Sequence, residues 1–150
     1  MKIRLTSIES GIAGEYFVAA ELSRRGLIAT LTIKNTKGID ILAARHTGQS
    51  VGIQVKTAYN SGKEWLLSKS AETAIDPNYF YVFVNLNNGK EPSYHIVPSV
   101  IVADRVARHH KEWLAGTKKD GGQRKDVDLR SFIDRACEYK DRWELLGLDE

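Results

Sequence analysis

Three polar residues interrupt two neighbouring apolar segments at positions where their side chains could meet. Asp40 lies within an apolar run, although a carboxylate has poor strand propensity. In residues 51–57 the polar side chains of Gln54 and Lys56 alternate with apolar ones, so both face one side of a strand. A hairpin folded about Thr47 places Asp40 opposite Gln54 and one pair from Lys56. The sequence therefore predicts an acid, an amide and an amine on one patch of a sheet.

A fourth candidate, Glu15, comes from a predicted helix over residues 7–25. Ser7 is expected to cap the start of this helix, with Ser10 as a competing cap, and Gly26 ends it. On a helical wheel at about 100° per residue, Glu15 falls at the centre of an apolar stripe. The stripe consists of Ile8, Ile12, Val18, Ala19 and Leu22. Because a carboxylate on the core side of a helix is costly unless it is paired or bound to a cation, Glu15 is expected to have such a partner.

These four groups suit metal-assisted hydrolysis of a phosphodiester bond. Two carboxylates supply oxygen ligands for Mg²⁺ or Mn²⁺, and Gln54 can add a neutral oxygen. Lys56 can position water or stabilise charge on a phosphate. The competing interpretation is a buried Asp40–Lys56 ion pair with Gln54 as a structural hydrogen-bonding group. Since buried charges rarely add net stability, and that pair does not explain Glu15, the catalytic interpretation is favoured.

Three short segments carry a resemblance to a known group of enzymes. Residues 14–22 (GEYFVAAEL), 38–40 (GID) and 53–56 (IQVK) resemble the PD-(D/E)XK nuclease superfamily, which includes restriction endonucleases and archaeal Holliday-junction resolvases. The resemblance covers residues 7–57 well, is looser beyond them, and extends to small bacterial proteins of this group. It implies a restriction-endonuclease-like αβββαβ core.

The same resemblance implies a role for each candidate residue. Asp40 corresponds to the metal-binding acid, Gln54 to the variable acid position and Glu15 to the helix carboxylate. The backbone carbonyl of Val55 contacts metal in this scheme, and Lys56 orients the attacking water.

Two departures from the superfamily pattern bear on activity. Ile39 occupies the proline position, which costs the assignment little. Gln54 replaces an acid and removes one negative charge, which weakens metal binding or shifts it onto Glu15. The alternative function is therefore a catalytically weak or inactive nuclease-fold module that binds nucleic acid or a protein partner. A third interpretation is a structural subunit in which Lys56 neutralises the two acids.

The apolar periodicity predicts one domain, residues 1–150, of the α/β or α+β class, with a mixed central sheet flanked by helices. Strands are expected at residues 27–33, 39–44, 51–57, 65–68, 79–84 and 94–97. A helix is expected at 100–114 and a mobile basic loop at about 116–126. The apolar residues from Val127 onward are interpreted as a C-terminal helix packed on the same core.

Charge alone favours an ordinary solvated surface of mixed sign, but the first half of the chain would present a basic, phosphate-binding face if its acids are occupied by the site. The net charge is only +3, but residues 1–75 carry ten Lys and Arg against six Asp and Glu, a difference of +4. The basic residues expected to rim the site and contact phosphate are Lys34, Lys37, Lys63 and Lys69. DNA is the expected substrate, although these residues do not separate DNA from RNA. Double-strand cutting favours a homodimer, which no residue establishes.

The remaining composition points to a cytoplasmic protein. Cys137 is the single cysteine, so no internal disulfide forms, and a reducing compartment is expected. The longest apolar stretches are far shorter than the roughly 20 residues that span a bilayer, so no membrane contact is expected.

Overall fold

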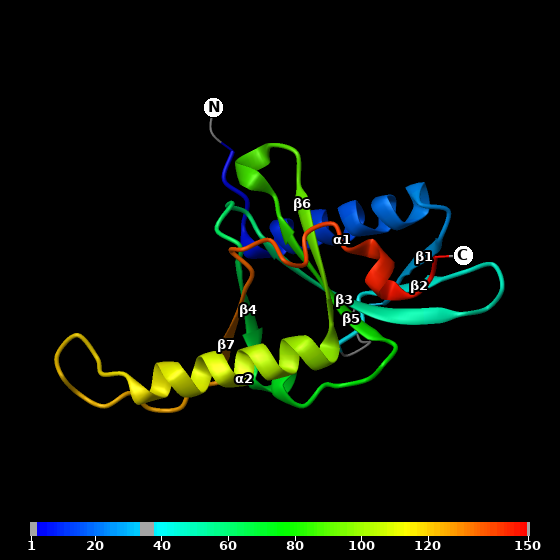
Figure 1. The fold of residues 1–150 in the computed structure, drawn as a ribbon. Helices are drawn as coiled ribbons and strands as arrows, with labels where there is room; N and C mark the ends of the chain where they lie inside the picture. The colour runs from blue at the N-terminus through cyan, green and yellow to red at the C-terminus, as the bar shows by residue number, and fades with distance from the viewer. Residues whose placement is uncertain (1–2, 34–37, 150) are drawn as a thin grey trace.

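A mixed five-stranded sheet forms the centre of the computed structural model, which describes residues 3–33 and 38–149 (Figure 1). Its strands, in spatial order, are β1 (Ile28–Leu31), β2 (Ile41–Ala44), β3 (Ser50–Ala58), β5 (Tyr79–Asn85) and β6 (Ser93–Pro98). Only the β3–β5 pair is parallel. The prediction of a mixed sheet with a buried strand near its centre is confirmed, because six of the seven β5 residues are buried.

The first helix, α1 (Ser7–Arg24), lies across one face of this sheet. Its N-cap is Thr6, one residue before the predicted cap, and Thr6 and Glu9 form a capping box in which each side chain bonds the other's backbone N–H. Thr6 rather than Ser7 caps the helix because Glu9, three residues after Thr6, can accept the Thr6 N–H with its side chain. The helix then buries Val18 and Leu22 against the sheet.

The helix α1 lies very close to the sheet at Gly14. A Cβ atom built on Gly14 would lie 1.8 Å from Oγ1 of Thr57 on β3, which no side chain can tolerate. Glycine is therefore required at this crossing, and it fixes the height of the helix above β3. The Thr57 hydroxyl is buried there and has no hydrogen-bond partner among the described residues.

The apolar stripe predicted around Glu15 is wrong in its orientation. The buried face of α1 consists of Ser10, Gly14, Val18 and Leu22. By contrast, Ile8 is 73% exposed and Ile12 is 45% exposed. Glu15 is half-buried and lies at the border between these two faces. Small residues at positions 10 and 14 let the helix approach closely on a side that a count of large apolar residues does not reveal.

A second layer covers the opposite face of the sheet. It consists of α2 (Ser99–Ala115), the short helix η1 (Lys69–Glu72) and a separate two-stranded sheet of β4 (Glu64–Ser68) and β7 (Leu129–Ile133). Trp65 of β4 is buried in this layer against Phe83 and Phe132. The predicted strand at 65–68 therefore exists, but it pairs outside the main sheet.

The predicted C-terminal helix is wrong, because residues 127–149, the part of this region that the structure describes, form no long helix. Residues 129–133 form strand β7, and only a short 3-10 helix, η3 (Trp143–Leu146), follows. In β7 the buried side chains are Arg130 and Phe132, which alternate as a strand requires. Arg130 occupies its buried position with ion pairs to Glu72 and Asp126. Because one of the two buried positions holds an arginine, the apolar residues alone do not show the alternation of a strand, and their spacing resembles that of a helix.

The chain after β7 covers one edge of the main sheet. Residues 139–141 cover the outer edge of β6, where Ile96 N–H donates to the Tyr139 carbonyl and Asp141 N–H donates to that of Tyr94. A short 3-10 turn, η2 (Asn87–Gly89), joins β5 to β6. The predicted loop at 116–126 is irregular and projects beyond α2 (Figure 1).

None of the described helices is long and apolar enough to span a membrane.

Candidate active site

Asp40 lies at the point where β2 separates from β3. The predicted hairpin register is confirmed within β2, where Ile41 pairs with Ile53, and the ladder ends at this pair, one residue after Asp40. Asp40 itself precedes the strand rather than lying within it. Its backbone N–H donates to the Ile53 carbonyl at 2.8 Å, and its Oδ2 accepts the backbone N–H of Val55 at 2.7 Å. The carboxylate therefore takes the place of a backbone carbonyl at the end of the ladder.

The second polar position, Gln54, is connected to the Asp40 turn by Tyr79, a residue that sequence reasoning missed. The Tyr79 hydroxyl lies 2.6 Å from the Gly38 carbonyl oxygen and 3.0 Å from Oε1 of Gln54. A phenol has one hydrogen, and the Gly38 oxygen can only accept it. The shorter contact therefore takes the hydrogen. The Gln54 Oε1 oxygen lies within hydrogen-bond distance of the same hydroxyl, so Tyr79 connects Gln54 to the Asp40 turn.

Tyr79 remains a neutral donor over the whole working range of pH. Burial raises its pKa, and the nearby Tyr81 and the negative charge of Asp40 raise it further. The residues next to Tyr79 in the sequence do not indicate this role, because Tyr79 comes close to Gln54 through the parallel pairing of β3 and β5.

Lys56 shares the Gln54 face of the sheet. In the parallel register Gln54 pairs with Tyr81 and Lys56 with Phe83, and all four side chains point to the face opposite α1. Lys56 is half-buried there. The prediction that the amide and the amine face the same side is confirmed.

Glu15 comes from the other side of the sheet. It follows Gly14, which contacts Thr57, and Thr57 is the neighbour of Lys56 along β3. Glu15 therefore lies on the helix side of the sheet, whereas Gln54 and Lys56 lie on the opposite face.

The predicted rim of cations is only partly near this site. The Lys63 carbonyl accepts the Asp134 N–H, which places Lys63 beside the C-terminal segment. Lys69 lies next to the site but forms an ion pair with Asp126 at 3.3 Å. Lys34 and Lys37 lie outside the described residues.

A cavity of about 470 Å³ opens beside Asp40 on the Gln54 face. Gly38 and Ile39, which lead into Asp40, form one wall, and Tyr79 and Tyr81 form the floor. The remaining lining residues are Gln54, Ser68, Ser70 and Ala74. Several of the groups that position Asp40 thus also line a space large enough for a ligand.

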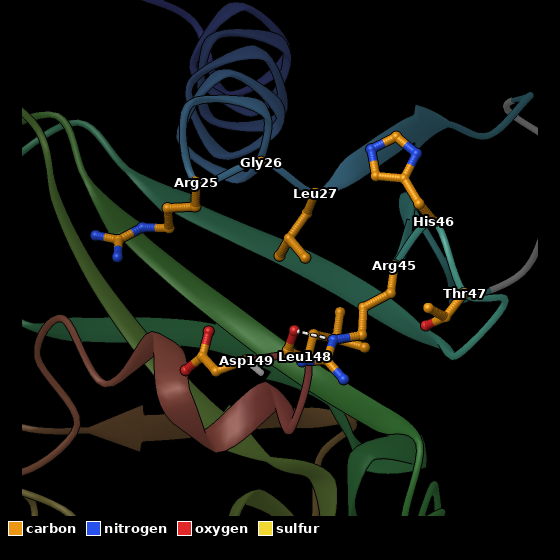
Figure 2. Close-up of a pocket in the computed structure, with 8 residues that line it drawn as sticks. All are labelled: Arg25, Gly26, Leu27, Arg45, His46, Thr47, Leu148 and Asp149. Carbon is orange, nitrogen blue, oxygen red and sulfur yellow. Dashed lines mark hydrogen bonds between the residues drawn. The ribbon is translucent and has the colours of Figure 1, made fainter.

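A second cavity of about 470 Å³ lies at the opposite end of the β2–β3 hairpin (Figure 2). Arg45 donates from Nε to the Leu148 carbonyl at 2.5 Å, and Leu148 is buried in the core of the α1 face. The other basic lining residue, Arg25, points away from Arg45 (Figure 2) and packs over the Trp143 ring. This cavity contains none of the predicted site residues, and its arginines hold the C-terminal segment in place.

The donor set around Asp40 is one that a hard divalent cation accepts. Within the described residues, no three His, Cys, Asp or Glu side chains gather as a metal-binding group. A cation would therefore combine Asp40 with neutral oxygens. The Val55 carbonyl lies on the same edge of β3 as its N–H, facing Asp40. The Gln54 oxygen lies within hydrogen-bond distance of the Tyr79 hydroxyl and keeps a second lone pair for a cation. Carboxylate and carbonyl oxygens are the ligands that Mg²⁺ prefers, so these residues fit it.

Comparisons with known proteins bear on the fold. No protein-family model and no curated protein sequence matches the chain. Among solved structures, it is similar to a bacterial homing endonuclease, with a TM-score of 0.59, 10% identity, and coverage of 96% of this chain and 94% of the other. It is also similar to Hjc, a Holliday junction resolvase from the archaeal hyperthermophile Archaeoglobus fulgidus, with a TM-score of 0.55, 12% identity, and coverage of 93% and 98%.

Both similarities extend over nearly the whole of each chain, at identities that establish shape rather than activity. The α+β architecture, the mixed five-stranded sheet and the two flanking helices agree with the predicted fold class. This chain has the restriction-endonuclease-like nuclease fold.

Proposed function

We propose that this protein is a divalent-metal-dependent nuclease that hydrolyses phosphodiester bonds in DNA. The observation that carries the proposal is the Asp40 carboxylate, held where β2 begins by the N–H of Val55, the residue between Gln54 and Lys56 on β3. The nuclease fold gives this arrangement its context, since both similar structures are of DNA-processing nucleases by name.

Each residue of the site has a role that follows from its chemistry. Asp40 would hold Mg²⁺ or Mn²⁺ together with the Val55 carbonyl, with Gln54 and Glu15 contributing further oxygens. The bound cation supplies Lewis-acid polarisation of the phosphate. The Lys56 ammonium, on the same face as Gln54, orients the attacking water and stabilises the negative charge that develops on phosphorus oxygens. Tyr79 keeps the Asp40 turn and Gln54 at a fixed separation.

The test is cleavage of DNA by the purified protein with and without divalent metal. Supercoiled plasmid, single-stranded and branched substrates are incubated with roughly millimolar Mg²⁺ or Mn²⁺, because a site with few carboxylates binds Mg²⁺ weakly. Cleavage that a chelator abolishes supports the proposal. Absence of cleavage on every substrate, with Mn²⁺ binding absent in calorimetry, contradicts it and favours a non-catalytic module.

Gln54 provides the sharpest test of metal binding. Replacing Gln54 with Glu restores a second carboxylate beside Asp40, so we expect Mn²⁺ affinity to rise by about tenfold or more, because charge count tunes such sites. Isothermal titration with Mn²⁺ measures this change. Gln123→Glu, in the exposed loop after α2, adds the same charge away from the site and is the matched control. Equal affinities of the two variants would contradict the assignment of Gln54.

A further inference from the structure

The cavity beside Asp40 has a lining unlike that of a phosphate or metal site. None of its described lining residues carries a charge. The Tyr79 ring, Ile39 and Ala74 supply apolar surface, whereas Ser68, Ser70 and Gln54 supply polar groups. A space with apolar walls and a few hydrogen-bonding groups suits a flat, uncharged and polar-edged heterocycle.

The polar edge of the cavity is arranged for hydrogen bonding. The hydroxyls of Ser68 and Ser70 lie 2.6 Å apart, so one of them donates to the other and both retain capacity for a ligand. Both serines are exposed. The Gln54 amide adds donor and acceptor atoms from the sheet. Together these groups match the mixed donors and acceptors on the edge of a nucleobase.

The wall that carries the serines is anchored. Lys69, between them, donates its backbone N–H to Asp128 and pairs its ammonium with Asp126, both at 3.3 Å. The Ala74 N–H donates to the Ser70 carbonyl at 3.1 Å. The cavity is therefore formed by a braced segment, and the Lys69 charge is engaged outside it.

The position of the cavity selects its occupant. Ile39 and Gln54 line the cavity, and the next residues along the chain, Asp40 and Val55, are hydrogen-bonded to each other. A phosphodiester bound at Asp40 would therefore have its adjoining nucleosides near this cavity. A base stacked inside a continuous duplex cannot enter a pocket of the protein, whereas an unstacked base can. We propose that this cavity receives the unstacked base of a nucleotide adjoining the phosphodiester at Asp40, so that the preferred substrate is single-stranded or branched DNA. This inference rests on the proposed nuclease function.

The experiment fills the cavity without touching the Asp40 group. Ala74 is half-buried in the lining, and Ala74→Leu places a larger side chain there. Thr73→Leu adds the same side chain at the neighbouring exposed position and is the matched control. Binding of a fluorescein-labelled flap oligonucleotide and of a continuous duplex is measured by anisotropy in EDTA, and cleavage of both is measured with Mg²⁺. Thermal unfolding of each variant verifies its fold.

We expect wild-type protein to bind and cleave the flap better than the duplex. Ala74→Leu should weaken flap binding by about tenfold, the size expected from loss of one stacked base, and change duplex binding by less than about twofold. Should Ala74→Leu unfold, Ser68→Ala with Ser70→Ala removes the polar edge and should lower the flap preference. An unchanged flap-to-duplex ratio in the folded variants overturns the base pocket and leaves the nuclease proposal standing. Flap preference in binding without any metal-dependent cleavage overturns the nuclease proposal alone.

Discussion

Replacing Asp40 with asparagine is expected to lower the rate of DNA cleavage by roughly 10²–10³-fold, the loss typical of removing one group that stabilises transition-state charge. Asparagine has the same shape, and its amide oxygen can still accept the Val55 N–H that the carboxylate accepts at 2.7 Å. The substitution therefore removes a charge while the turn keeps its bond. Single-turnover cleavage at saturating Mg²⁺ measures the change.

The control for this prediction is Asp104→Asn on α2, where the carboxylate is exposed and pairs with Arg108. We expect its cleavage rate to equal that of the unmodified protein. If Asp40→Asn retains activity within threefold, in rough terms less than about 1 kcal/mol of barrier, Asp40 does not bear the catalytic charge.

Replacing Asp134 with alanine is expected to lower the free energy of unfolding by about 3–5 kcal/mol, because it leaves buried donors without their acceptor. Asp134 and His95 are 1% and 0% exposed, and their side chains lie 2.6 Å apart. The same carboxylate accepts the backbone N–H groups of Glu138 and Tyr139 at 2.9 and 3.0 Å. Urea denaturation measures the loss. Asp104→Ala, which removes an exposed ion pair, should cost less than about 1 kcal/mol.

The same pair makes stability depend on pH. Burial lowers the pKa of His95 below its ordinary value of 6.5, although the Asp134 carboxylate opposes the shift. As the pH falls below about 6.5, the unfolded chain binds a proton that the folded chain does not, so the free energy of unfolding decreases until the pH passes the folded pKa. His95→Gln should remove this slope, and His46→Gln, at an exposed position, should keep it. A slope that survives in His95→Gln would assign the effect to another group.

The pKa of Asp134 adds a second loss at lower pH. Burial raises that pKa, but the His95 bond and the two backbone N–H groups outweigh burial and hold it below 3.8. Stability from this carboxylate is therefore complete above about pH 3.8 and is lost as the pH falls through the folded value.

Local information predicted the hairpin that carries the site. The alternation of Gln54 and Lys56 and the turn at Thr47 are properties of consecutive residues, and they predict the β2–β3 register that the structure confirms from Ile41 opposite Ile53 onward. The fold class followed as well, because the order of apolar segments restricts the possible layers.

Long-range contacts account for what the sequence did not reveal. Glu15 was placed at the centre of a buried stripe because large apolar residues surround it, yet α1 turns a glycine toward the sheet instead. Tyr79 contacts Gly38 and Gln54 across a parallel strand pair, and contacts between residues so far apart in the sequence cannot be predicted from local patterns. Arg130 can occupy a buried strand position because it forms ion pairs with Glu72 and Asp126. A charged residue at a buried position makes this strand hard to recognise from the sequence, and the segment was interpreted as a helix.

The glycine at the α1 crossing also restricts how this site can change. A helix that rests on large side chains can slide when one of them is trimmed, and it carries its functional groups with it. At Gly14 the helix backbone lies directly against the Thr57 side chain, so the helix has nothing to trim there and no room for a larger residue. The height of Glu15 above the sheet therefore depends on the residue at position 57 of β3, and a substitution there would move the helix carboxylate relative to the strand.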